Sequence, residues 1–75
     1  MDIRHLEYFV EVCQEMSFTK ASRNLHVSQP SISKMIKNLE DELEICLFHR
    51  TSKKIELTEE GRLLLSRARD ILAGV

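Results

Sequence analysis

The most constraining feature of this sequence is a pair of helical segments joined by a turn of four residues at most. The first helix is predicted over residues 18–25, where Ser17 is a good N-cap and the small Ala21 lets another helix approach closely. The second is predicted over residues 29–43, where Ser28 is the N-cap and a proline in the first turn costs no hydrogen bond.

The second of these helices has one apolar and one polar side. The apolar stripe, at spacings of four, three and four, consists of Ile32, Ile36, Leu39 and Leu43. Gln29, Ser33 and Lys37 lie on the opposite side, with Pro30 and Lys34 beside them. The acidic residues 40–42 are unfavourable for the helix dipole and would repel a phosphate backbone, so only the N-terminal half can face a polyanion.

The remaining segments predict two further helices and a small hairpin. Apolar residues at helical spacing predict a helix from about residue 3 to residue 15, and two short strands are predicted at 47–49 and 55–57. Thr58 then caps a last helix, which would be about 25 Å long if it continued to residue 75. With two glycines and one proline in 75 residues, the chain is predicted to be mainly α.

Charge is distributed unevenly, although the net charge is −1. Residues 17–37 carry basic but no acidic side chains, and a second basic island occupies 49–54. Residues 1–16, 38–48 and 55–60 are net acidic. Net charge alone argues weakly against a nucleic-acid partner, but two basic islands in an acidic chain indicate one positive face.

Several classes of function find no support in the sequence. The longest apolar run is residues 45–48, whereas a membrane span needs about 20 residues. The N-terminus lacks the pattern of a secretion signal, so we expect an intracellular, cytoplasmic domain without a membrane partner. No nucleophile elbow, glycine-rich phosphate loop or paired carboxylates indicate an enzyme or a cofactor. Cys13 is expected to be a small buried hydrophobe, and neither it nor Cys46 forms a metal motif.

The short turn between a helix and a helix with an exposed polar N-terminus predicts a helix-turn-helix. Such a motif places the first turns of its second helix in the DNA major groove. Gln29 can pair with adenine and Lys34 can donate to guanine. The hairpin tip with Lys53 and Lys54 would be a wing that reaches the DNA, or else only a flexible basic loop. The rival interpretation is a protein-binding helical module that uses the last helix.

Five stretches of the chain resemble the amino-terminal domain of LysR-type bacterial transcriptional regulators. They are, in chain order, residues 17–22, 25–33, 39–43, 47–51 and 57–61. The resemblance implies a winged helix-turn-helix DNA-binding domain over 1–57 and a linker helix over 58–75 that pairs two subunits. It also implies a larger effector-binding domain outside this chain, so that a small-molecule effector would act only through that domain.

The resemblance further implies which side chains meet double-stranded DNA. Base edges would be contacted by Gln29, Pro30, Ser33 and Lys34. The backbone would be held by Ser17, Thr19, Ser31, Arg50 and Thr51, with Lys53 in the wing. Lys37 and Lys54 are added as backbone contacts. The alternative for Lys34 and Lys37 is that they only solubilise this side of the helix, and phosphate contact is expected for one of them rather than both.

The last helix has more apolar surface than one docking face needs. We expect a homodimer through Leu64, Ala68, Ile71, Leu72 and Val75, and therefore an interrupted palindrome as the DNA site. The run 63–65 is open to a second interpretation, a single broad face that packs within the chain. Gly61 is either required for close packing or a tolerated helix defect.

The sequence departs from the family pattern after the second helix of the motif. The family usually has glycine there, where this chain has Glu44. Either Glu44 adopts a left-handed conformation at a cost of about 1 kcal/mol, or the turn differs.

Overall fold

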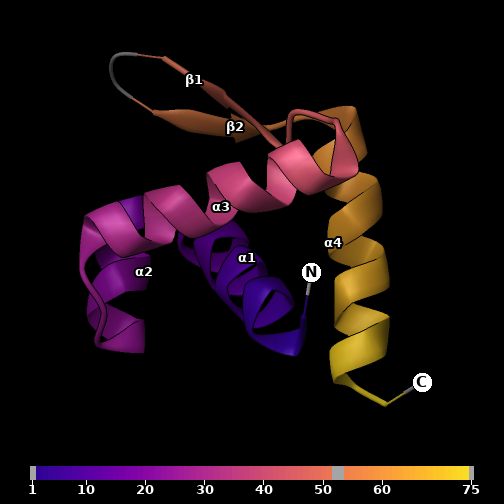
Figure 1. Ribbon diagram of the computed structural model, residues 1–75, viewed down its shortest axis with the longest axis horizontal. Coiled ribbons are helices and arrows are strands. Elements are labelled where there is room, and N and C mark those ends of the chain that lie inside the picture. Colours follow the sequence, from indigo (N-terminus) through magenta and orange to yellow (C-terminus); the bar gives the residue numbers. More distant parts are fainter. Residues whose placement is uncertain (1, 52–53, 75) are drawn as a thin grey trace.

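The computed structural model, which describes residues 2–51 and 54–74, is mainly helical with one small hairpin (Figure 1). In chain order its elements are α1 (Ile3–Glu15), α2 (Phe18–Leu25), α3 (Gln29–Leu43), β1 (Phe48–Arg50), β2 (Ile55–Leu57) and α4 (Glu59–Leu72). This is the predicted winged helix-turn-helix architecture, with the hairpin as the wing and α4 as the last helix.

Helix α1 is the centre of the packing, since it contacts each of the other three helices in the described chain. Its Phe9 and Val12 have no exposed surface. From α3, Ile32, Ile36 and Leu39 of the predicted apolar stripe are buried against them, while Leu43 is only partly buried. The amphipathic pattern of α3 therefore orients that helix, because its apolar side covers α1 and α2 and its polar side faces solvent.

The predicted N-caps all hold their helices. The side chains of Ser17, Ser28 and Thr58 accept hydrogen bonds from the backbone N–H groups three residues later, at 3.1, 3.2 and 2.9 Å. Asp2 caps α1 in the same way, and the backbone N–H of His5 lowers the pKa of its carboxyl group. Each helix start is thus specified by one side chain close in sequence.

Strand β1 begins one residue later than the sequence predicted. The expected strand was 47–49, but the pairing runs from Phe48 opposite Leu57 to Arg50 opposite Ile55. Leu47 does not complete a ladder pair with Thr58, because its N–H donates to the Glu40 carboxylate at 2.7 Å instead of to the facing strand. Its carbonyl oxygen accepts from the backbone N–H of Thr58 at 3.0 Å. These long-range hydrogen bonds could not be read from strand periodicity.

Helix α4 ends at Leu72, three positions short of the predicted end, because Ala73 caps it and Gly74 has a φ of 78°. Ala68, predicted to lie at a dimer seam, is fully buried in the core and has no surface to offer a partner. Leu64 is partly buried against the same core. Helix α4 packs on α1 and so shares the core of the domain. The separate role expected for residues 58–75, as a linker that pairs two subunits, stays a prediction.

Gly61 lies at a close approach between α4 and the segment that carries the hairpin. A Cβ atom at this position would meet the carbonyl oxygen of Leu47 and would lie 2.6 Å from Cδ1 of Leu57. The first of these neighbours is backbone and cannot rotate away. Of the two readings of Gly61, the structure therefore supports a requirement for close packing.

Three non-glycine residues end helices in the left-handed conformation. Met16, His26 and Glu44 have φ values of 48°, 58° and 58° and follow α1, α2 and α3. The N–H of Glu44 donates to the carbonyl oxygen of Glu40, which closes the end of α3. Glu44 thus adopts the left-handed conformation expected where the family usually has glycine, with the steric strain that its Cβ atom brings.

Replacing Glu44 with glycine should stabilise the chain by about 1 kcal/mol, because it removes the Cβ strain at positive φ. For a domain of this size, the thermal midpoint should rise by about 4–8 °C, measured by circular dichroism. The control is Glu44→Ala, which removes the charge but keeps the Cβ and should shift the midpoint much less. Equal stabilisation by both variants would assign the effect to the charge instead.

Candidate nucleic-acid interface

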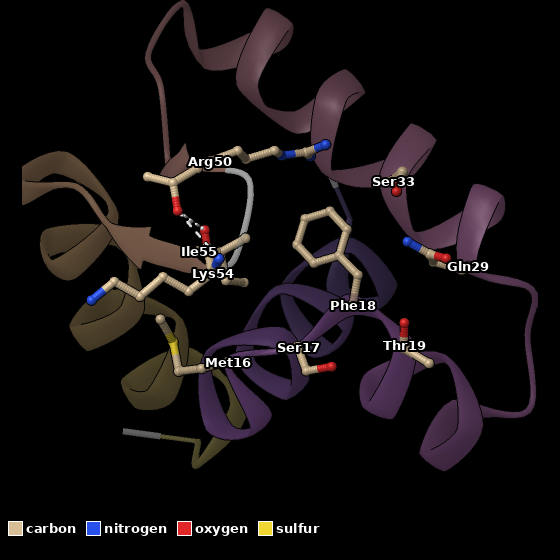
Figure 2. Close-up of a pocket in the computed structure, with 10 residues that line it drawn as sticks. Met16, Ser17, Phe18, Thr19, Gln29, Ser33, Arg50, Lys54 and Ile55 are labelled. Atoms are coloured by element: carbon tan, nitrogen blue, oxygen red, sulfur yellow. Dashed lines mark hydrogen bonds between the residues drawn. The ribbon is translucent and has the colours of Figure 1, made fainter.

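A groove of about 520 Å³ lies where the beginnings of α2 and α3 face the hairpin (Figure 2). The described residues that line it are Met16, Ser17, Phe18, Thr19, Gln29, Ser33, Arg50, Thr51, Lys54 and Ile55. Seven of these ten were predicted as DNA contacts from the sequence. Three separate segments of the chain therefore converge on one concave surface.

The N-caps place the polar side chains of the groove. Ser17 and Ser28 start α2 and α3, and Gln29 and Ser33 follow one turn apart on the same side of α3. Figure 2 shows them on the side that faces Phe18 and the hairpin. Gln29 is exposed, so its amide is available to a base edge.

The basic side chains of this region differ in their partners. The ammonium group of Lys54 lies 3.2 Å from the carboxylate of Glu56, and that of Lys37 lies 3.2 Å from Asp41. The guanidinium of Arg50 lies over the ring of Phe18, 4.4 Å from its centroid. Both lysine pairs are exposed surface ion pairs of small energy, so a phosphate group can displace them.

Other predicted contacts lie outside the groove or are already engaged. Pro30, Ser31 and Lys34 are exposed in the first half of α3 but do not line the groove, and the Ser31 hydroxyl is 2.8 Å from that of Ser28. Lys37 lines a second, acidic depression with Glu40, Asp41 and Glu44. Lys37 is therefore paired at the acidic end of α3 and does not line the groove.

Thr51 is occupied by the hairpin turn. Its hydroxyl donates to the carbonyl oxygen of Lys54 at 3.0 Å and also accepts from the N–H of Lys54 at 3.2 Å. The side chain thus stabilises the turn that presents Lys54. Lys53 lies outside the described residues, as does Val75 of the predicted dimer seam.

Sequence reasoning missed the apolar floor of the groove, formed by Met16, Phe18 and Ile55. Phe18 is the first residue of α2 and part of the hydrophobic core. It is buried, with 8% of its surface exposed, yet it also lines the groove beneath Arg50. No local pattern signals this second role, because Phe18 and Arg50 are far apart in sequence.

The two cysteines occupy opposite environments. Cys13 is buried in α1, and burial raises the pKa of its thiol to about 12, although nearby Arg69 opposes the shift. Cys46 is exposed. Across residues 2–51 and 54–74, no group of three histidine, cysteine or acidic side chains is placed to hold a metal ion. None of the helices in the same residues is long and apolar enough to cross a membrane.

Residues 3–62 match the family model described as "Bacterial regulatory helix-turn-helix protein, lysR family". The match covers most of the chain. The chain belongs to this family, and the resemblance noted from its motifs is confirmed.

Individual relatives agree with this assignment. The uncharacterized HTH-type transcriptional regulator YwbI of Bacillus subtilis is 67% identical over 57 residues, which are 76% of this chain and 19% of YwbI. The dual regulator OxyR of Escherichia coli is 45% identical over 75 residues, which are 100% of this chain and 25% of OxyR. The chain thus spans about a quarter or less of the curated relatives it matches.

Among solved structures, the DNA-binding domain of BenM in complex with catB site 1 DNA superimposes with a TM-score of 0.94 and 44% identity. The match covers 99% of this chain and 83% of that one. The winged helix-turn-helix architecture is therefore the fold of a known DNA-binding domain.

The environments of the two thiols predict their reactivity. Because the pKa of Cys13 rises from 9.0 to about 12 on folding, its thiol stays protonated and unreactive at pH 8. A disulfide reagent such as DTNB should titrate one thiol per folded chain and two in urea. The same shift predicts that the free energy of unfolding falls as the pH rises from 9 towards 12.

The Cys46→Ser variant is the control, since its folded form should show no fast thiol. A fast-reacting thiol in that folded variant would contradict the buried environment of Cys13.

Proposed function

We propose that this chain binds double-stranded DNA in a sequence-specific manner, as the DNA-binding domain of a LysR-type transcriptional regulator. The observation that carries the proposal is the convergence of Gln29 and Ser33 with Arg50 and Lys54 on one groove. A helix with short polar side chains at its start, bordered by cations, has the composition that base readout and phosphate contact require.

In this proposal the first half of α3 enters the major groove. Gln29 and Ser33 contact base edges there, and the exposed Pro30 and Lys34 lie beside them on the same half of the helix. The second half stays away from the phosphates, because the negative charges of residues 40–42 repel them.

Phosphate contacts come from both sides of the groove. On one side are Ser17 and Thr19 at the start of α2, and on the other are Arg50, Thr51 and Lys54 of the hairpin. Ser31, which is exposed at the start of α3 outside the groove, would add a further contact. Phosphate contacts fix orientation without reading sequence, so these residues set the register in which α3 meets the bases.

The solved BenM domain supports the proposal, because it has this fold and is in complex with DNA. The curated relatives are named as transcriptional regulators, and none of those named here is called an enzyme. We also propose, from the family and its named relatives, that the protein to which this chain belongs regulates transcription. On the same family basis we propose that this protein is cytoplasmic and responds to an effector.

We further propose that two chains pair through α4. Its exposed large apolar side chains are Leu63, Ile71 and Leu72, with 66%, 50% and 37% of their surfaces exposed. Ile71 and Leu72 belong to the seam expected from the sequence. Leu63 precedes Leu72 by nine positions and therefore lies on the opposite side of the helix, outside that seam. A two-fold dimer would read half-sites about 34 Å apart, or a multiple of that distance, in an interrupted palindrome.

Selection from a random duplex library tests the DNA-binding proposal. The chain should enrich one interrupted palindrome, and Gln29→Ala should bind that site about 5- to 150-fold more weakly and lose selectivity at one base pair, as the loss of a bidentate contact predicts.

Asn38→Ala is the matched control, since it removes an amide from the exposed surface of the same helix. It should change neither affinity nor selectivity. Failure to enrich any sequence would refute sequence-specific binding. Binding to DNA should weaken as the salt concentration rises. If the chain instead binds a protein partner with an affinity that does not depend on salt, the alternative of a protein-binding module is favoured.

Introducing a charged side chain on the exposed apolar surface of α4 tests the dimer proposal. Ile71→Glu places a carboxylate on exposed apolar surface, so it should leave the fold intact and yield monomers in sedimentation velocity. Leu64→Glu is not a clean test, because Leu64 packs on the core. Ser66→Glu, on an exposed position of the same helix, should remain dimeric. A dimeric Ile71→Glu variant would refute this seam.

A further inference from the structure

Of the two basic side chains that line the groove in the described residues, Arg50 packs on an aromatic ring, whereas Lys54 pairs with a carboxylate. The guanidinium of Arg50 lies 4.4 Å from the centroid of the Phe18 ring. Within the described residues, no acidic side chain forms an ion pair with Arg50, whereas Lys54 is paired with Glu56. An aromatic face attracts a cation through its quadrupole and leaves the positive charge uncancelled.

This difference matters for an anionic partner. Lys54 must exchange its carboxylate for a phosphate group, although the exposed ion pair that it breaks is worth little. Arg50 gives up nothing of that kind. Its planar guanidinium also has N–H donors that match phosphate oxygens, and these remain available when the ring holds the cation from one face.

Phe18 is itself held firmly from below. Its ring meets that of Phe48 edge-on, with centroids 5.9 Å apart and planes at 79°. Phe48 in turn packs on Phe9, with centroids 5.7 Å apart. Phe9 is fully buried in α1, and Phe48 is 6% exposed. A continuous series of rings therefore runs from the centre of the core to Arg50 at the groove.

Phe18 also connects two elements that must be aligned. It is the first residue of α2, directly after the Ser17 cap, whereas Arg50 is the last residue of β1. The contact between them sets the hairpin cation at a defined position relative to the helix-turn-helix. Figure 2 shows the Arg50 side chain extending from the hairpin towards α3, above Phe18.

We propose that Phe18 is a positioning residue for DNA binding, which pre-orders the Arg50 guanidinium as an unneutralised phosphate ligand at the groove. The inference rests on the proposed function and deepens it by assigning a role to a core aromatic residue. Ordering a flexible side chain upon binding costs about 0.5–1.5 kcal/mol, and the ring removes that cost in advance.

A double-mutant cycle tests this role with a random-sequence 30-base-pair duplex as the probe, because phosphate contacts do not depend on sequence. Phe18→Leu should weaken binding about 2- to 12-fold, which is the ordering cost expressed as affinity. Arg50→Gln should weaken it at least as much and make the salt dependence shallower by about one unit. In the Arg50→Gln background, Phe18→Leu should have no further effect.

Three controls separate positioning from a structural role. Phe9→Leu removes a ring from the same series without contacting Arg50, so its effect should add to that of Arg50→Gln. Phe18→Leu should add to Lys54→Gln, since Lys54 has a different partner. Phe18→Tyr keeps the ring and should restore wild-type affinity. Thermal unfolding of each variant verifies that it is folded at the assay temperature.

The geometry can also be checked without DNA. Arg50 side-chain protons above an aromatic ring should resonate upfield in the NMR spectrum of the free chain, and the shift should disappear in Phe18→Leu. Independent, additive effects of Phe18→Leu and Arg50→Gln, or an unshifted Arg50, would overturn the proposal. Absence of any duplex binding by the wild-type chain would instead refute the proposed function itself.

Discussion

The packing of Phe48 against Phe9 and Phe18 is the contact on which the groove depends. A two-stranded hairpin of three residues per strand has little stability of its own. It gains a fixed position because Phe48, at the start of β1, is buried against rings from α1 and α2. Without that anchor, Arg50 and Lys54 would have no defined place relative to α3.

A second set of interactions joins the hairpin to α4. The hydroxyl of Thr58 donates to the carbonyl oxygens of Cys46 and Leu47 at 2.6 and 3.2 Å and accepts from the N–H of Gly61. One buried side chain thus closes the hairpin base and starts the last helix. The missing side chain of Gly61 lets these segments meet, so the wing and the proposed dimer helix are held by the same few atoms.

The positions of the helices were largely predictable because their signals are local. Ser17, Ser28 and Thr58 cap helices through hydrogen bonds to residues three positions away, and the stripe of α3 follows helical periodicity. The start of β1 and the burial of Ala68 were not predictable in this way. They depend on Glu40 reaching Leu47 and on α1 covering one side of α4, which are contacts between distant segments.

The order of the elements, their caps, their apolar sides and the family motifs follow from residues within a few positions of each other. The pairing of the basic residues follows from such local neighbours only in part. Lys37 and Lys54 pair with the nearby carboxylates of Asp41 and Glu56, whereas folding sets Arg50 over the ring of Phe18. Whether a charge is neutralised depends on distances of a few ångströms in space, and for Arg50 the deciding neighbour is far away along the chain.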